Sequence, residues 1–324
     1  MKSILCCGYI ALDLISFKSQ FTRRAGGTAG NVACNLSFLG WNASVAGVVG
    51  QDAAGRVLHQ DLRKAGVDVK HLSSRPEAGT PAVVHEVSDR GHRFSFHCPE
   101  CGRRFPKYRP LDEAAARSLC EEIDVDVFFF DRASIATAIL AETLRDKGAL
   151  VVFEPSTQGR EPARCLKAAH VVKYSTERAA AVEPLLSGAH PRLKIVTDGA
   201  KGATATLNGR DLVVPALPAN LVDAGGAGDW TTAGTLWSLL KSADRWTAST
   251  VEDALRAGQA LASVSCGYPG ARSVTDFLTR DEMLKAARDV IEEHRPPPSE
   301  PTLPRRPRPR SSGCAACLSA AQVA

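Results

Sequence analysis

Residues 223–230, which read DAGGAGDW, combine small side chains with two carboxylates in a way that suits phosphoryl transfer. An apolar pattern typical of a helix begins within this stretch, so Gly226, Ala227 and Gly228 lie at a predicted helix N-terminus. Backbone N–H groups there lack partners within the helix, and side chains this small let an anion approach them closely. Asp229 lies at the same helix start and could accept the proton of an attacking hydroxyl.

The same stretch has a second interpretation when it is taken alone. Asp229 could be an ordinary carboxylate in the first turn of a helix, and the glycines could form a tight turn. A second glycine-rich segment, residues 25–55, also runs into a predicted helix, with Asn31 and Asn35 on one side of that helix. The pair of segments favours the chemical interpretation.

Together the two segments resemble the ribokinase-like (PfkB) family of carbohydrate kinases. The family's N-terminal pattern, G-G-x-x-x-N-x-A followed by L-G, matches residues 26–33 and 39–40, and its C-terminal pattern, D-T-x-G-A-G-D, matches residues 223–229. The resemblance extends to about residue 290. It implies a three-layer α/β/α sandwich with a mostly parallel central sheet and a small β lid. It also implies phosphorylation, by ATP with Mg²⁺, of a hydroxyl on a sugar, nucleoside or related polyol.

The resemblance gives roles to individual residues. Asp229 matches the catalytic base, and Gly226, Ala227 and Gly228 match the anion hole. Glu177 matches an acidic position linked to the metal and the phosphates. Positions that contact the substrate are matched by Asp13, Gly27 and Asn31.

Further residues are expected near the ligands. The nucleotide is expected along Thr197, Gly199 and Lys201, with Asp223 at the start of the C-terminal motif. Lys201 could meet a phosphate, although its charge is equally typical of a solvated turn. Asp131 could reach the substrate at the carboxyl end of a strand, or it could cap the next helix.

Three positions depart from the family pattern. Ala224 replaces threonine and Thr231 replaces phenylalanine in the C-terminal motif, and Tyr174 replaces the asparagine of an N-x-x-E motif that ends at Glu177. The last change would remove an amide near the metal and phosphates, and losing such a contact costs about ten- to a hundredfold at other metal sites. The alternative to an active kinase is therefore a catalytically weak sugar-binding regulatory or interaction protein on the same fold.

Short apolar runs alternate with helical patterns along the chain, which is typical of βαβ units and a largely parallel sheet. Residues 80–97 instead alternate apolar and polar positions around 89–91, as a half-exposed hairpin does, and we assign the lid to about 11–24 and 80–105. Strands are predicted at 3–12, 43–50, 125–131, 149–155, 170–175, 193–199 and 204–209, and helices at 31–39, 54–65, 135–147 and 161–168, with a last helical stretch ending near 294.

A kinase domain is therefore expected over residues 1–293, followed by a Pro/Arg-rich, largely disordered tail over 294–324. Residues 295–324 hold five arginines and one glutamate, which is +4 of the chain's net charge of +5. Because this tail lacks interleaved aromatic residues, the sequence does not favour nucleic-acid binding.

The N-terminus, MKSILCCGYIALDLISF, superficially resembles a secretory signal. Asp13 interrupts the apolar run, so we favour a buried first strand and a cytoplasmic location. No apolar run approaches the roughly 18 to 20 residues that span a bilayer, and no membrane association is expected. The family often pairs subunits through the lid, which makes a homodimer an expectation here.

Cysteines occur in two C-x-x-C pairs, Cys98 with Cys101 and Cys314 with Cys317. Four thiolates could hold a structural Zn²⁺ and clasp the tail to the lid, or the two pairs could be unrelated thiols. Six other cysteines lie in apolar segments and are expected in the core: Cys6, Cys7, Cys34, Cys120, Cys165 and Cys266.

Overall fold

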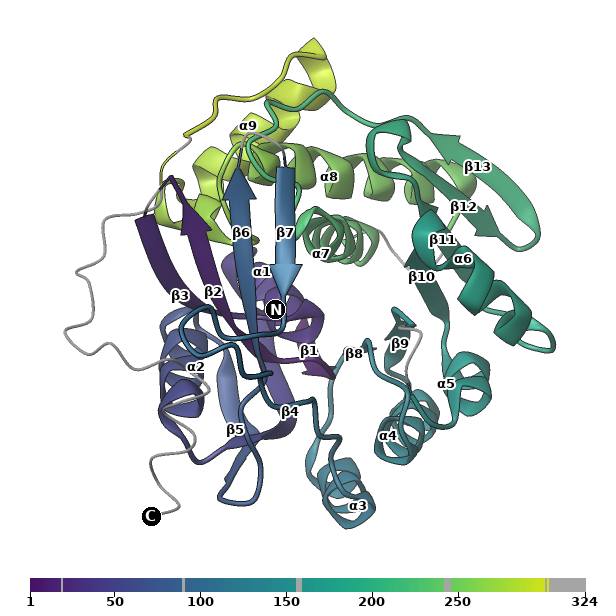
Figure 1. Cartoon of the computed structure of the whole chain (residues 1–324). Helices are drawn as coiled ribbons and strands as arrows, with labels where there is room; N and C mark the ends of the chain where they lie inside the picture. The colour runs from purple at the N-terminus through teal and green to yellow at the C-terminus, as the bar shows by residue number, and fades with distance from the viewer. Residues whose placement is uncertain (19, 89–90, 156–158, 242–245, 301, 303–324) are drawn as a thin grey trace.

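The computed structural model contains a large central β-sheet and a small second sheet beside it (Figure 1). The described central strands follow the order β13-β12-β11-β10-β9-β8-β1-β4-β5, with parallel pairing from β11 to β5 and antiparallel pairing on both sides of β12. Residues 1–18, 20–88, 91–155, 159–241, 246–300 and 302 are described. The strands are β1 (Ser3–Cys7), β4 (Asn42–Gly50), β5 (Asp68–Arg75), β8 (Val127–Phe130), β9 (Leu150–Phe153), β10 (Val171–Ser175), β11 (Leu193–Thr197), β12 (Ala203–Leu207) and β13 (Arg210–Val214).

Helices cover both faces of this sheet (Figure 1). One face packs against α1 (Thr28–Phe38), α2 (Ala53–Lys64), α7 (Ala227–Leu239), α8 (Ala248–Cys266) and α9 (Arg280–Glu293). The other packs against α3 (Glu113–Glu122), α4 (Ile135–Asp146), α5 (Pro162–Ala168) and α6 (Thr176–Val182). Three short 3-10 turns complete the chain: η1 (Glu183–Leu186), η2 (Gly199–Lys201) and η3 (Ser273–Asp276).

Each inner strand is apolar on both faces, which is why its sequence is a continuous apolar run. In β8, Phe129 enters the core beside α1 and α7, while Phe128 and Phe130 enter the core beside α3 and α4. Successive side chains of a strand point to opposite faces, so one apolar run fills two cores. The three-layer α/β/α prediction is confirmed.

The second sheet, which we call the lid, has the strand order β3-β2-β6-β7. It consists of β2 (Ala11–Phe17), β3 (Gln20–Gly26), β6 (Ala82–Ser88) and β7 (Gly91–Ser95). The expected hairpin is present, since β6 and β7 pair antiparallel and Ser88 lies opposite Gly91. One face of the lid packs Leu12, Leu14 and Val84 against Ala54 of α2. The lid is therefore anchored on the helix that follows the N-terminal glycine-rich segment.

Several expected boundaries are wrong. The predicted strand 3–12 ends at Cys7, because the chain then turns so that the Tyr9 N–H donates to the Asp131 carboxylate over 2.8 Å, and β2 leaves for the lid. Helix α1 begins at Thr28, three residues earlier than predicted. The strand predicted at 204–209 is β12, which ends at Leu207 and pairs antiparallel with β11. Elements that the sequence patterns did not reveal include β5, β13, α3 and α8.

Little of the tail can be compared with its prediction. Residues 295–300 and 302 have no regular helix or strand, and residues 301 and 303–324 lie outside the described part of the chain. Asn220 donates to the Pro297 carbonyl over 2.7 Å, so the first tail residues contact the loop before α7. Within the described residues, no helix combines the length and apolarity needed to cross a bilayer.

Candidate active site

The C-terminal glycine-rich motif forms the start of α7, as predicted. Gly226 is the N-cap residue with φ of 80°, a left-handed conformation that favours glycine, and an added Cβ would lie 2.4 Å from the Cβ of Ala271. The indole of Trp230 is fully buried, and its N–H donates to the Ala271 carbonyl over 2.9 Å. These contacts hold the helix start against residue 271.

The backbone donors of this turn are not all free. The N–H of Ala227 donates to the Ala224 carbonyl over 3.1 Å. Among the described residues, no acceptor is paired with the N–H of Gly226 or Gly228. An incoming anion therefore meets these two donors and the positive end of the helix dipole.

Asp229 lies in the first turn of α7 and contacts the other glycine-rich segment. Its Oδ2 accepts a hydrogen bond from Nδ2 of Asn31 over 2.7 Å, which joins α7 to α1. Burial and the nearby Glu154 charge raise the pKa of Asp229 to about 7, against the opposing influence of Asn31 and Lys173. A carboxylate with such a pKa can exchange a proton near neutral pH.

Two charged residues beside Asp229 were not predicted as site residues. Glu154 directly follows β9, and its Oε2 lies 3.2 Å from Nζ of Lys173 on β10 and accepts a hydrogen bond from Thr232 over 3.0 Å. Both side chains of the ion pair are almost fully buried. The sequence signal that could have identified this pair is a lysine within the apolar run of β10, because charged residues are seldom buried without a function.

The predicted substrate-binding residues lie around the N-terminal segment. An added Cβ on Gly26 would lie 1.9 Å from Oδ2 of Asp13, so the Asp13 carboxylate rests against the backbone before Gly27. Burial raises the pKa of Asp13 to about 6, with His85 and Arg272 acting in the opposite direction. Oδ1 of Asn31 is buried and has no hydrogen-bond partner among the described residues. It is a free acceptor beside Asp229.

Asp131 lies at the carboxyl end of β8 and is fully buried. It accepts the Tyr9 N–H over 2.8 Å and pairs with Nη1 of Arg132 at 2.6 Å. Burial raises its pKa to about 6. It does not cap α4, because the side chain of Ser134 accepts the Thr137 N–H there. Asp131 therefore organises the turn after β1.

Tyr174, at the position matched to the family's asparagine, lies in the core of the protein. Since Lys173 faces Asp229, the next residue of β10 points to the opposite side of the sheet. Tyr174 is fully buried among α4 and α5 residues, and its hydroxyl donates to Glu183 over 3.4 Å. The effect of this departure on the metal and phosphates stays a prediction.

The residues expected along the nucleotide lie at the ends of two neighbouring strands. Thr197 ends β11, Gly199 and Lys201 form η2, and Glu177 is exposed in the first turn of α6 after β10. Nζ of Lys201 pairs with Asp198 at 3.0 Å and is largely exposed. A ligand that lies across the ends of β10 and β11 can contact all of them.

Asp223 differs from its prediction as a nucleotide-binding residue. Its side chain is fully buried and accepts N–H groups from Gly225 over 2.8 Å and from Gly270 over 2.6 Å. The carboxylate therefore supports the turn from within and offers no exposed oxygen to a nucleotide.

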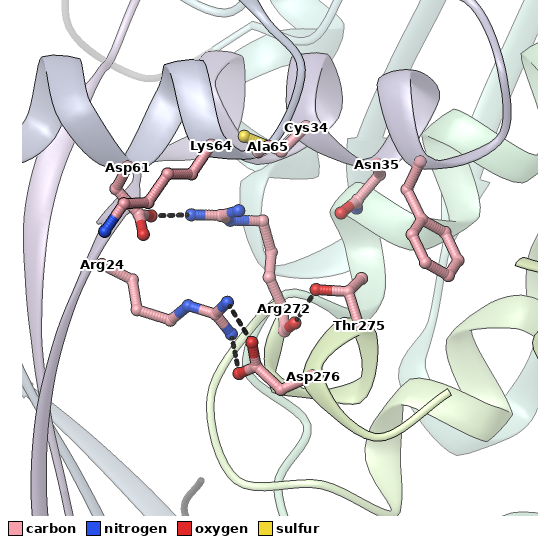
Figure 2. Close-up of a pocket in the computed structure, with 10 residues that line it drawn as sticks. Arg24, Cys34, Asn35, Asp61, Lys64, Ala65, Arg272, Thr275 and Asp276 are labelled. Atoms are coloured by element: carbon pink, nitrogen blue, oxygen red, sulfur yellow. Dashed lines mark hydrogen bonds and ion pairs between the residues drawn. The ribbon is translucent and has the colours of Figure 1, made fainter. Parts of the chain in front are cut away.

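A polar cavity of about 310 Å³ lies behind the N-terminal segment (Figure 2). Arg272 pairs with Asp61 at 2.8 Å, and Arg24 of the lid pairs with Asp276 at 2.8 Å. Asn35, one helical turn after Asn31, lines this cavity. The two ion pairs fasten the lid strand β3 and helix α2 to the segment around η3.

The zinc and dimer expectations stay predictions. Cys98 is buried and Cys101 is exposed, while Cys314 and Cys317 lie outside the described residues, so the clasp has no structural support. The lid exposes about half of the side chains of Phe21, Phe94 and Phe96, which are candidate apolar contacts for a dimer. The six cysteines predicted in the core are buried.

Comparison with known proteins addresses the family directly. The family model described as pfkB family carbohydrate kinase matches residues 1–277. The chain belongs to the pfkB family. It is 29% identical over 235 residues to a fructokinase of Klebsiella pneumoniae, covering 66% of this chain and 76% of that protein. It is also 29% identical over 265 residues to an ATP-dependent ribose-1-phosphate kinase of Halopiger xanaduensis, covering 80% and 85%.

Solved structures support the fold of this pfkB-family chain. A fructokinase from Vibrio cholerae O395, solved with fructose, ADP and calcium ion, superposes with a TM-score of 0.71 at 22% identity, covering 90% of this chain and 99% of the other. The ribokinase-like fold inferred from the two motifs is thus confirmed.

Proposed function

We propose that this pfkB-family protein transfers the γ-phosphoryl group of ATP to a hydroxyl of a sugar, nucleoside or related polyol. The observation that carries the proposal is the contact between Asn31 and Asp229. It places a buried carboxylate of raised pKa and a free amide oxygen beside the open N-terminus of α7. A hydroxyl needs a proton acceptor, and the transferred group needs donors that are already oriented.

In the proposed reaction, the substrate hydroxyl gives its proton to the Asp229 carboxylate. Its oxygen forms a bond to the γ-phosphorus as the bond to the oxygen bridging the β- and γ-phosphates breaks, and ADP leaves. The N–H groups of Gly226 and Gly228 stabilise the charge on the transferred phosphoryl oxygens. Asp13, Gly27 and Asn31 bind the other substrate hydroxyls, because carboxylate and amide groups can pair with neighbouring hydroxyls.

ATP would lie across the ends of β10 and β11, along Thr197, Gly199 and Lys201. The carboxylates of Glu154 and Asp131 are close enough to Asp229 to raise its pKa. This concentration of negative charge suits Mg²⁺. Oxygen donors of this kind are those that Mg²⁺ prefers, and Glu177 would act through the phosphates. The bound ion supplies charge neutralisation for the phosphates.

A coupled assay of ADP release tests the proposal. The acceptor panel contains fructose and other hexoses, pentoses, ribose 1-phosphate and nucleosides, each with ATP and Mg²⁺; the relatives' names make fructose and ribose 1-phosphate the first choices. We expect ADP above background with at least one acceptor. Ligand-induced thermal shifts without ADP release from any acceptor would favour the regulatory alternative.

Replacing Lys173 by methionine should move the pH profile of the reaction. Lys173 lowers the pKa of Asp229, so its loss leaves that pKa higher and requires more alkaline solution for the ionised base. We expect the acidic limb of kcat/KM to shift to higher pH, with partial recovery of kcat/KM as pH rises. A uniform loss of activity at every pH would contradict this role, and Lys285→Met, at an exposed lysine of α9, is the matched control.

A further inference from the structure

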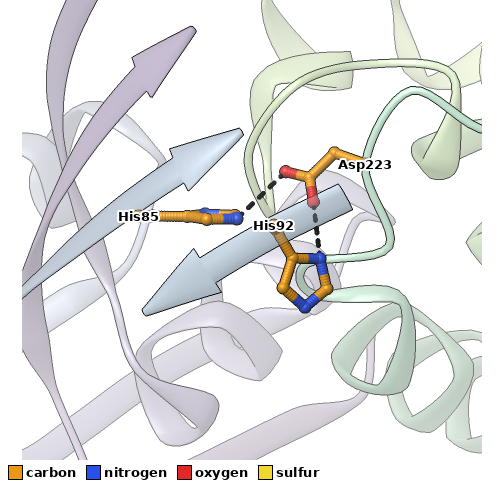
Figure 3. A group of neighbouring side chains, drawn as sticks. All are labelled: His85, His92 and Asp223. Carbon is orange, nitrogen blue, oxygen red and sulfur yellow. Dashed lines mark hydrogen bonds and ion pairs between the residues drawn. The ribbon is translucent and has the colours of Figure 1, made fainter. Parts of the chain in front are cut away.

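Two histidines of the lid and the first aspartate of the C-terminal motif form a compact group (Figure 3). Nε2 of His85, on β6, lies 3.3 Å from Oδ2 of Asp223, and Nδ1 of His92, on β7, lies 3.1 Å from Oδ1 of the same carboxylate. All three ligand atoms lie within 4.8 Å of one another. The proposed phosphoryl transfer makes no use of either histidine.

The register of the lid hairpin places the two rings side by side. His85 lies opposite Phe94, and Val87 lies opposite His92, so His85 and His92 are diagonal neighbours on one face of the lid. Their ring centroids are 5.5 Å apart and nearly perpendicular. Phe94 packs against both rings, with its centroid 4.5 Å from that of His85 and 5.0 Å from that of His92. The imidazoles are thus held in place by their neighbours.

The carboxylate is held just as firmly. Each oxygen of Asp223 accepts one backbone N–H, from Gly225 and from Gly270. The turn also approaches the lid closely, since an added Cβ on Gly225 would lie 2.4 Å from Cε1 of His85. Each carboxylate oxygen keeps a second lone pair for another partner.

The ring of His85 supplies an independent sign of a missing ligand. Its side chain is 2% exposed, yet Nε2 has no hydrogen-bond partner of good geometry among the described residues. Its contact with Oδ2 of Asp223 lacks the geometry of a hydrogen bond, and an ion between the two groups would give the buried nitrogen a well-directed partner. His92 is 30% exposed and opens a path for that ion from solvent.

We propose that His85, His92 and Asp223 bind a divalent transition-metal ion of the Zn²⁺ class. Bonds of about 2.0–2.1 Å to a tetrahedral Zn²⁺ place neighbouring ligand atoms roughly 3.3 Å apart. Each histidine nitrogen lies at about this distance from a different oxygen of Asp223, and one ligand atom from each of the three residues lies within 4.8 Å of the others. Two imidazoles and one carboxylate suit Zn²⁺ better than Mg²⁺ or Ca²⁺, which prefer oxygen ligands. Water would complete the coordination of the ion.

The bound ion would join the lid to the turn that begins α7. Since His85 and His92 come from the lid strands and Asp223 precedes the anion hole, occupancy would hold the lid against the catalytic turn. This site is distinct from the cysteine pairs, which use sulfur ligands.

Co²⁺ is the probe for the test, because its visible absorption reports coordination and its near-ultraviolet bands report thiolate ligands. We expect the full-length protein to bind one equivalent through nitrogen and oxygen, and His92→Gln to weaken that affinity at least tenfold. His190→Gln, at an exposed histidine, should bind like the wild type. His92 is chosen over the buried His85 so that the variant folds.

A thermal measurement provides the second readout. Zn²⁺ should raise the Tm of the wild type and of His190→Gln, and should raise that of His92→Gln markedly less. The proposal is overturned if Co²⁺ binds the wild type and His92→Gln equally, if the bound ion shows only thiolate bands, or if no ion binds. Neither measurement depends on kinase turnover.

Discussion

Asp229→Asn should lower turnover by about a hundred- to ten-thousandfold, the range for loss of a general base, while the binding of substrate and ATP is retained. Asparagine keeps an oxygen that can accept the Asn31 Nδ2 hydrogen bond, now 2.7 Å long, so the geometry of the helix start is preserved. It cannot accept the hydroxyl proton. Steady-state kinetics with the best acceptor from the ADP-release panel, together with isothermal titration of both ligands, measure the two parts of this expectation.

The same variant should not be less stable than the wild type at pH 8. A buried carboxyl whose pKa is raised from 3.8 to about 7 destabilises the folded protein increasingly as pH rises across that interval, because the charged form is costly to bury. Asparagine stays neutral and removes this cost. We therefore expect an equal or higher Tm at pH 8, and the difference from the wild type should shrink toward pH 4.

Asp253→Asn, at an exposed carboxylate on α8, is the matched control and should leave both turnover and Tm unchanged. Unchanged turnover in Asp229→Asn would remove Asp229 from the mechanism. A large fall in its Tm at pH 8 would show instead that the carboxylate has a structural role.

Arg272→Met should be the most destabilising single change considered, by about 3–5 kcal/mol in the free energy of unfolding at neutral pH. Arg272 pairs with Asp61 at 2.8 Å with both side chains buried, and it also donates to the Ala25 carbonyl. Asp61 in turn accepts the Ala25 N–H over 2.9 Å. Methionine fills similar volume but leaves Asp61 as a buried charge without its main partner.

The loss should depend on pH in a defined direction. Burial alone would raise the pKa of Asp61, but the charges of Arg272 and Arg24 and the hydrogen bonds from Ala25 and Arg272 lower it below its usual value. Because the pKa of Asp61 is lower in the folded protein than in the unfolded protein, where it is about 3.9, the ionised carboxylate stabilises the folded state above that pH. This stabilisation disappears as pH falls through the pKa of Asp61 in the folded state. The penalty of Arg272→Met should therefore be largest near neutral pH and smaller in acid, where Asp61 is protonated.

Urea unfolding followed by tryptophan fluorescence measures this penalty. The double variant Asp61→Leu/Arg272→Met should recover part of it, because no unpaired charge is left. Lys285→Met breaks an exposed pair on α9 and should cost no more than about 1 kcal/mol. Equal losses in Arg272→Met and Lys285→Met would contradict the importance of the buried pair.

The parts of the site that rest on local backbone chemistry could be predicted from the sequence. The glycines before α7 and the helix start near Gly226 follow from turn and helix-end requirements within a few residues. The approach of Asn31 to Asp229 was expected only because two motifs resembled one family, since nothing local joins residues so far apart.

Side-chain direction in the strands could not be read from the sequence. Lys173 of β10 pairs with Glu154, and alternation sends its neighbour Tyr174 into the opposite core. Glu154 was overlooked because a carboxylate after an apolar run is equally typical of a loop. The lid histidines could not be connected to Asp223, because hairpin register and docking across the fold decide that contact.

The hydrogen bond between Asn31 and Asp229 joins positions 198 residues apart. A polypeptide still emerging from the ribosome, or one cut by a protease before α7, would carry the complete lid and every described strand of the central sheet yet lack the proposed proton acceptor. If Asp229 is the base that we propose, hydroxyl activation requires that synthesis has passed the C-terminal motif and that α7 has packed against α1.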